Sequence, residues 1–255
     1  MRKNFTLNYH SILPEKSAHK NFFHPVYSVR EKTFRQHLEL IKESQFNVIS
    51  IDEWYTGKLD EDNILLTFDD GHQSDFKTVF PLLEEYGFKG TFFISLKNLK
   101  GDSSRWAEYR AMLEAGHSIE AHGVSHKYLN ELSADDELKE LLLSKSTIED
   151  RLGAEVKAFS YPGGKYSKRT ITNLTETGYR FGFTTNYGWN GLLQDTSVMN
   201  RFTVKFGTSS RTLQKHLDGN GLFTYRKKIA DRSKKVFSKF IGSKLADQID
   251  YSVYA

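Results

Sequence analysis

Two adjacent aspartates, Asp69 and Asp70, are the first residues whose types suggest chemistry. They end the stretch NILLTFDD, which begins at Asn63 and is followed by Gly71. Its apolar and β-branched residues are typical of a buried strand. Two neighbouring carboxylates repel each other, and neither gains by leaving water. A cation beside them would remove this difficulty, so the pair raises the question of a metal site.

A second cluster contains two histidines four residues apart, His122 and His126, in the stretch EAHGVSHKYL. If a helical turn follows His122, this spacing places both imidazoles on one side, where they can share an ion. Taken alone, an Asp-Asp-Gly is most often a turn, and paired histidines occur on ordinary helix surfaces. Together, one carboxylate and two histidines make a three-ligand site with open positions. That arrangement indicates catalysis, because structural metal sites are closed.

The elements that must position these residues alternate along the chain. Apolar runs predict strands at 4–9, 47–51, 64–68, 90–94, 117–121, 158–161 and 180–185. Helical patterns between them predict helices at 33–44, 76–86, 106–115, 134–152 and 168–177, with Ser133 as an N-cap. This alternation predicts an α/β fold, a distorted (β/α) barrel of about seven parallel strands. Functional residues of such a barrel lie where strands end, as Asp69, Asp70 and His122 do.

Composition limits the ligands and the partners. The chain of 255 residues is long enough for a full core, and because it has no cysteine, a metal must be bound by histidine and carboxylate. A formal charge of +4 is too small an excess to indicate nucleic-acid binding. The sequence shows neither a signal peptide nor a membrane-spanning run, so we expect a cytoplasmic protein, although a trimmed exported protein would look the same.

Three motifs resemble, in order, those of the NodB-type polysaccharide deacetylases (carbohydrate esterase family 4). They are TFDDG at 67–71, HGVSH at 122–126 and FSYPGGKYS at 159–167. The opening LNYHSI and the stretch at 27–54 resemble more narrowly the poly-N-acetylglucosamine deacetylase branch. In that branch a histidine near the N-terminus replaces the usual C-terminal one. The resemblance covers roughly the first 205 residues.

The resemblance implies a role for each matching residue. Asp70, His122 and His126 would bind a divalent metal, with zinc expected and nickel or cobalt as alternatives. Asp69 would be the general base that takes a proton from the attacking water. The backbone N–H of Gly163 would help to hold the oxyanion.

The third motif departs from the family pattern at two positions. Ser160 stands where the family has an arginine, and Arg201 is our candidate to orient the base instead. A surface salt bridge is an equally weighted alternative for Arg201. Gly163 stands where many relatives have an aromatic residue, which removes a wall of the sugar pocket.

The leaving amine needs a proton, and His10 is the expected donor because it ends the first predicted strand. The alternative is a histidine bonded to backbone at the end of the barrel. His216 competes by its place in the chain but falls in a helical pattern. For contacts to the sugar we expect Tyr161, Pro162 and Trp189, although most aromatic residues belong to the core.

The expected activity is metal-dependent hydrolytic N-deacetylation of an N-acetylated sugar, within a polysaccharide, an oligosaccharide or a glycan precursor. Hydrolysis of a small non-sugar amide is one alternative, and a carbohydrate-binding relative without turnover is another. Residues 1–221 are expected to form the catalytic domain and residues 222–255 a basic helical extension. Packing of that extension on the barrel is favoured over contact with an anionic membrane surface.

Overall fold

A curled parallel sheet forms the centre of the protein. The computed structural model describes residues 4–16, 24–56, 61–99, 101–191 and 194–219. Its main sheet has the strand order β10-β1-β5-β6-β7-β8-β9, and each neighbouring pair is parallel. The short strand β4 pairs with the beginning of β5, and a separate two-stranded sheet joins β2 to β3. The predicted extension at 222–255 lies outside the described residues.

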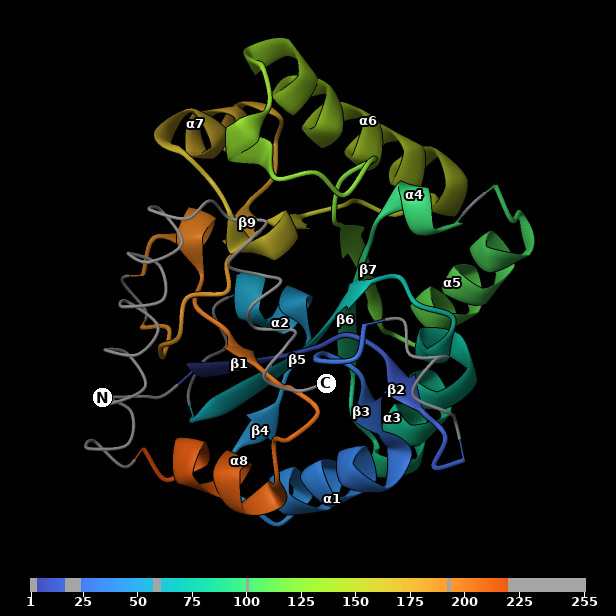
Figure 1. Cartoon of the computed structure of the whole chain (residues 1–255), viewed down its shortest axis with the longest axis vertical. Coiled ribbons are helices and arrows are strands. Elements are labelled where there is room, and N and C mark those ends of the chain that lie inside the picture. Colours follow the sequence, from blue (N-terminus) through green and yellow to red (C-terminus); the bar gives the residue numbers. More distant parts are fainter. Residues whose placement is uncertain (1–3, 17–23, 57–60, 100, 192–193, 220–255) are drawn as a thin grey trace.

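The strands have the following bounds: β1 Asn4–Tyr9, β2 Ile12–Leu13, β3 Val29–Arg30, β4 Asn47–Val48, β5 Asn63–Asp70, β6 Gly90–Ile94, β7 Ser118–Ala121, β8 Ala158–Ser160, β9 Phe181–Phe183 and β10 Phe202–Thr203. The helices are α1 Glu31–Lys42, α2 Ile51–Tyr55, α3 Phe80–Tyr86, α4 Leu96–Leu99, α5 Ser104–Glu114, α6 Ala134–Leu152, α7 Lys168–Glu176 and α8 Ser210–Leu217. Most of these helices surround the sheet on its outer side (Figure 1).

The two faces of β5 explain how the core is divided. Side chains alternate along a strand, so Ile64, Leu66 and Phe68 pack outward in the large cluster between the sheet and the helices. Leu65 faces inward, into a second cluster that includes Phe93 and Phe183. The inner face becomes polar toward the carboxyl end of the strand, where Thr67 and Asp69 follow.

The edges of the sheet come together through the chain segment before β10. Met199 bridges to Phe183 of β9, and three residues later Phe202 pairs with Leu7 of β1. The sheet therefore curls around its inner cluster, as the predicted distorted barrel requires. This closure also brings Arg201, between Met199 and β10, into the interior, where it is 1% exposed.

The predicted elements agree with the structure except at several ends and at 47–51, where only β4 is a strand and Ile51 begins α2. The strands at 4–9 and 90–94, the helix at 134–152 and the Ser133 N-cap are confirmed. The strand predicted at 64–68 is longer, because β5 pairs with β6 through Asp69 and Asp70 themselves. The helix predicted at 76–86 is divided into a π-helical turn, Asp75–Val79, and α3. Among the described residues, no helix is long and apolar enough to cross a membrane.

Candidate metal centre and its catalytic neighbours

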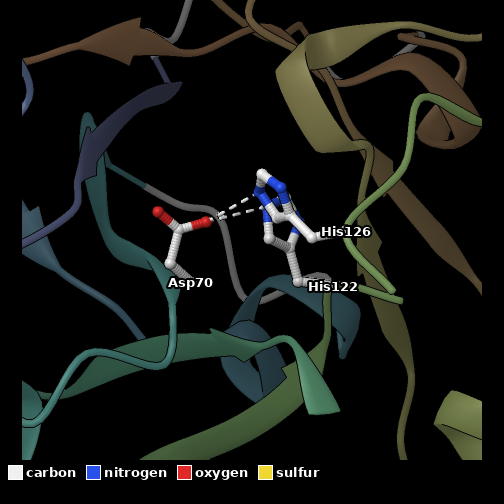
Figure 2. A group of neighbouring side chains, drawn as sticks. All are labelled: Asp70, His122 and His126. Carbon is white, nitrogen blue, oxygen red and sulfur yellow. Dashed lines mark ion pairs between the residues drawn. The ribbon is translucent and has the colours of Figure 1, made fainter. Parts of the chain in front are cut away.

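Asp70, His122 and His126, here called the metal triad, meet at the carboxyl end of the sheet. Asp70 is the last residue of β5, and His122 follows β7 directly. Asp70 Oδ1 lies 3.3 Å from His122 Nε2 and 3.0 Å from His126 Nε2, and Figure 2 shows both imidazoles turned toward this oxygen. One ligand atom from each residue falls within 4.8 Å of the others.

The backbone is strained at two members of the triad. Among the described residues, the non-glycine residues with positive φ are Asp70, at 81°, and His126, at 57°. Such conformations cost free energy and persist where the surrounding structure holds them. Asn98 Nδ2 donates a 2.9 Å hydrogen bond to the carbonyl of Asp70, which is one such constraint. The strain turns the Asp70 and His126 side chains toward a common point.

The expected helical turn after His122 is absent, so that part of the prediction is wrong. A loop joins the two histidines, and Gly123 reverses it with a φ of 82°. The carboxylate of Glu140, on α6, accepts hydrogen bonds from the backbone N–H groups of Val124, at 2.7 Å, and Ser125, at 2.9 Å. The imidazoles converge because Glu140 fixes the loop, not because of helical spacing.

The donor set fits a divalent cation. His122 Nδ1 lies 2.7 Å from the carbonyl oxygen of Ser160, so in the neutral imidazole Nδ1 carries the proton and Nε2 presents a lone pair. That lone pair faces Asp70 Oδ1, which among the described residues accepts no hydrogen bond and lies between the Nε2 atoms of His122 and His126. Two acceptors in contact are unfavourable unless a cation or a proton lies between them. Ligand atoms about 2.1 Å from a tetrahedral ion lie roughly 3.4 Å apart, close to the observed separations.

The second aspartate, Asp69, is surrounded differently. Arg201 binds it through two hydrogen bonds of 2.8 Å, one to each carboxylate oxygen. Ser160 Oγ donates to Oδ2 at 3.0 Å, and Asn8 Nδ2 donates to the same oxygen at 3.3 Å. We call these four residues the Asp69 network. Burial alone would raise the pKa of Asp69, but the charges of Arg201 and His122 outweigh it and hold that pKa below its usual value.

Arg201 lies where an orienting partner of Asp69 is needed. Its Nη2 also donates to Ser160 Oγ at 2.8 Å, and its Nε donates to the carbonyl of Thr184 at 2.9 Å. The side chain is fully buried, which rules out the alternative of a surface salt bridge. Ser160 of the third motif thus contacts an arginine that comes from the segment before β10.

His10 follows the carboxyl end of β1 and lies at the same end of the sheet as the metal triad. Burial lowers the pKa of His10, while the nearby charges of Asp70 and Asp69 act to raise it. Its ring stacks on Tyr27 with 4.7 Å between the ring centres, and its buried Nδ1 has no hydrogen-bond partner among the residues that the structure describes. The competing His216 lies on α8, where its Nδ1 is 2.8 Å from the hydroxyl of Tyr187 and its ring packs on Phe202.

The turn after β8 contains Pro162 and Gly163. Ser160, the last residue of that strand, contacts both His122 and Asp69, so the turn begins beside the site. Gly163 is exposed and has a φ of 60°. This places the residues of the third motif next to the metal triad.

The two aromatic residues predicted to contact sugar lie elsewhere. Tyr161 is fully buried and its hydroxyl donates to the carbonyl of Ser197 at 2.8 Å, which places it in the core. Trp189 packs on Phe5, near the amino end of β1 and opposite the metal triad. Both residues were predicted to contact sugar because they lie near loops of the site in the sequence. Both rings instead pack in apolar surroundings.

Several residues of the site were missed by sequence reasoning. Asn8 lies in a predicted strand in which polar residues alternate with apolar ones, which was a usable signal because buried polar side chains need partners. Glu140 gave no signal, since a glutamate within a charged helix is ordinary. Asn98, which bonds the carbonyl of Asp70, likewise has no pattern that marks it.

Comparison with known proteins agrees with this geometry. Residues 56–182 match the family profile described as polysaccharide deacetylase. The chain belongs to the polysaccharide deacetylase family. A Bacillus subtilis protein, YxkH, whose name places it in this family, is 27% identical over 219 residues, covering 83% of this chain and 75% of the relative. The poly-β-1,6-N-acetyl-D-glucosamine N-deacetylase of Staphylococcus aureus is 21% identical over 203 residues, covering 71% of this chain and 68% of the relative.

Solved structures support the fold of this deacetylase family member. The Streptococcus pyogenes deacetylase PplD, in complex with acetate, superposes with a TM-score of 0.76 and 24% identity, covering 84% of this chain and 97% of PplD. A de-N-acetylase from Aggregatibacter actinomycetemcomitans gives a TM-score of 0.73 at 19% identity, covering 84% of this chain and 99% of that one. The curled parallel sheet is therefore the fold of the family.

Proposed function

We propose that this protein hydrolyses the N-acetyl group of an amino sugar within a glycan or a glycan precursor, with a divalent cation, zinc by preference, held by the metal triad. One observation carries the proposal. The two adjacent aspartates have different surroundings: Asp70 faces two imidazole nitrogens, while Asp69 is held ionised beside them by Arg201. This is the division between a metal ligand and a general base that amide hydrolysis requires.

The reaction would break the amide C–N bond and form a bond between the carbonyl carbon and a water oxygen, giving acetate and a free amine. A cation on the triad would act as a Lewis acid and lower the pKa of water. Asp69 would accept the proton of the attacking water, and Arg201 keeps its carboxylate ionised and oriented. The backbone N–H of Gly163 would donate to the oxygen that becomes negative. His10 would give a proton to the departing nitrogen.

The poly-N-acetylglucosamine deacetylases are the branch we favour for this chain. Two features support it: the similarity to the staphylococcal enzyme, and the position of His10 at the end of β1 near the triad. The burial of His216 against Phe202 and Tyr187 on α8 further favours His10 as the proton donor. The proposal names a class of substrate, the N-acetylated glycans, and no particular sugar, linkage or chain length.

A panel of substrates tests the proposal. Metal-loaded protein would be incubated with N-acetylglucosamine oligomers in β-1,6 and β-1,4 linkage and with small non-sugar amides, and released acetate would be measured. We expect acetate from at least one oligosaccharide and little from the small amides. Hydrolysis of the small amides alone would favour the alternative activity. Binding of an oligosaccharide without acetate release would indicate a non-catalytic relative.

A further inference from the structure

An open surface pocket on the segment that follows His126 points to a binding site for a second sugar. The cavity has a volume of about 340 Å³ and is lined by Lys127, Tyr128, Glu131 and Leu132. We call these four residues the 127–132 pocket. Its volume is at the lower end of the ~300–1,000 Å³ found for small-molecule sites in proteins. We propose that it is a subsite for the sugar unit next to the one being deacetylated, with Tyr128 as the specificity-determining residue. This inference rests on the proposed function.

The exposure of the metal triad shows from which side a substrate approaches. The side chain of His126 is 34% exposed, whereas those of His122 and Asp70 are 2% and 8% exposed. A glycan therefore reaches the triad across His126. The chain continues from His126 directly into Lys127 and Tyr128, so the 127–132 pocket borders this approach.

Tyr128 occupies the space that a side chain at position 163 would need. A Cβ atom built on Gly163 would lie 2.6 Å from Tyr128 Cε1 and 3.2 Å from Cζ, closer than van der Waals contact allows. The ring is half-buried, so part of it remains open to solvent. Tyr128, from the loop that carries His126, thus lies where a side chain at position 163 would lie and would supply the wall that Gly163 lacks.

The 127–132 pocket is built on a fixed turn. Residues Leu129–Glu131 form a single 3-10 turn, with a hydrogen bond of 3.0 Å from Glu131 N–H to the carbonyl of Tyr128. Arg169, on α7, donates a 2.8 Å hydrogen bond to the carbonyl of Leu132 and pairs with the buried Glu137 at 2.9 Å. The lining is therefore held in place without a ligand, which lowers the entropic cost of binding.

The chemistry of the lining fits an uncharged sugar ring. A phenol ring offers an apolar face to the C–H face of a pyranose, and Leu132 extends that surface. Lys127 and Glu131 are exposed at the same pocket and offer donors and acceptors to hydroxyl groups. One cation and one anion together give no preference for a polyanion, so a neutral N-acetylated amino sugar fits better than a uronic acid.

The test compares a tetrameric sugar with a substrate that needs only the catalytic centre. The substrates are the β-1,6-linked and β-1,4-linked N-acetylglucosamine tetramers and p-nitrophenyl acetate. Tyr128→Leu keeps apolar bulk over Gly163 but removes the aromatic face, and Tyr128→Phe is the matched control. We expect Tyr128→Leu to raise KM for the better tetramer about tenfold, the scale of one aromatic contact. Its kcat for the tetramer and its rate on the ester should stay within about twofold, as should all values for Tyr128→Phe.

An unchanged KM for the tetramer in Tyr128→Leu would overturn the subsite. An equal loss on tetramer and ester would also overturn it, because it would show that Tyr128 only supports the loop. Direct binding of both tetramers to Asp69→Asn protein, with and without Tyr128→Leu, separates this inference from the proposed function. If the wild type released no acetate, a tenfold weaker binding in the double variant would still support the subsite. No binding of either tetramer, or equal binding, would contradict it.

Discussion

The two neighbouring aspartates of this protein differ in their surroundings. One carboxylate is bound by hydrogen-bond donors of the protein, and the other faces two imidazoles, as expected for a metal ligand. In the Asp69 network, Arg201 donates a hydrogen bond to each carboxylate oxygen. Ser160 and Asn8 donate further hydrogen bonds to Oδ2. In the metal triad, Asp70 Oδ1 faces the Nε2 atoms of His122 and His126, and the backbone has a positive φ at two of the three residues. The carboxylate of Asp69 is fully bound by protein donors. The metal triad instead has a strained backbone that leaves its ligand atoms facing one another, as a cation site requires.

The buried imidazoles show the same contrast. Both nitrogens of His37 have protein partners: Nδ1 lies 3.1 Å from the hydroxyl of Tyr9, and Nε2 lies 3.1 Å from the carbonyl of Thr208. In His122, Nδ1 has such a partner, the carbonyl of Ser160, whereas Nε2 faces Asp70 of the metal triad. The structural imidazole of His37 has protein partners at both nitrogens. That of His122 leaves Nε2 available as a metal ligand.

The largest expected effect concerns His10, which belongs to neither region and is the proton donor in the proposed reaction. Expelling an amine anion is unfavourable, so His10→Ala should lower kcat on an N-acetylated sugar by about 100-fold to 10,000-fold. It should lose less on p-nitrophenyl acetate, whose leaving group needs no proton. The control His216→Ala should keep near wild-type activity per folded molecule. If His216→Ala lost most of its activity and His10→Ala stayed near wild type, the proton donor would instead lie in the C-terminal part.

Breaking the Asp69 network should destabilise the protein. Arg201→Met leaves a buried carboxylate without its cation, which typically costs about 3–5 kcal/mol. The control is Arg35→Met, because Arg35 also binds a carboxylate twice, that of Glu85 at 2.9 and 3.0 Å, but at the surface. That exposed pair should contribute about 1 kcal/mol or less. Urea unfolding of both variants measures the difference, and equal losses would show that burial does not distinguish the two pairs.

Loosening the loop of the metal triad should weaken metal binding while leaving the ligands in place. Glu140→Gln loses part of the acceptor that holds Val124 and Ser125, so the affinity for Zn²⁺ should fall by about tenfold. Glu137→Gln is a control on the same helix, since Glu137 bonds Arg169 and Asn173 instead of the loop. Competition with a zinc chelator measures both affinities. Equal affinities in the two variants would contradict the positioning role of Glu140.

The smallest effect concerns His37, whose two ring nitrogens both have protein partners. Burial lowers the pKa of His37 to about 4, below the value of 6.5 in the unfolded chain. The neutral form is therefore favoured in the fold, and its stabilisation is complete above pH 6.5 and lost as the pH falls toward 4. Between pH 7.5 and pH 5 this should reduce the free energy of unfolding by about 1–2 kcal/mol. Urea titrations of wild type and His37→Gln should show this part of the pH dependence in the wild type alone.

Local patterns were sufficient for much of the fold. The predicted strand at 4–9, the strand at 90–94 and the helix at 134–152 have the observed bounds because their periodicity and caps are local. The metal triad could be predicted for the same reason, since Asp70 and His122 each come at a strand end. The conformation between His122 and His126 could not, because it depends on Glu140 from another element.

Contacts between distant segments limited the prediction of the remaining site residues. Arg201 meets Asp69 across 132 positions of sequence, and only closure of the sheet through Met199 brings it there. Trp189 was misplaced because the loop after β9 returns to the amino end of β1, where Asn190 N–H bonds the carbonyl of Asn4 at 2.8 Å. Tyr128 went unnoticed because its importance depends on the missing side chain at Gly163.

The most direct test of the division between the two aspartates is the metal content of Asp69→Asn and Asp70→Asn, measured by elemental analysis together with kcat. Asp69→Asn should retain about one divalent ion per chain and lose about 100-fold or more in kcat, as expected for a general base. Asp70→Asn should lose the metal. A metal-free Asp69→Asn beside a fully loaded Asp70→Asn would reverse the two roles, and equal metal content in both would contradict the distinction itself.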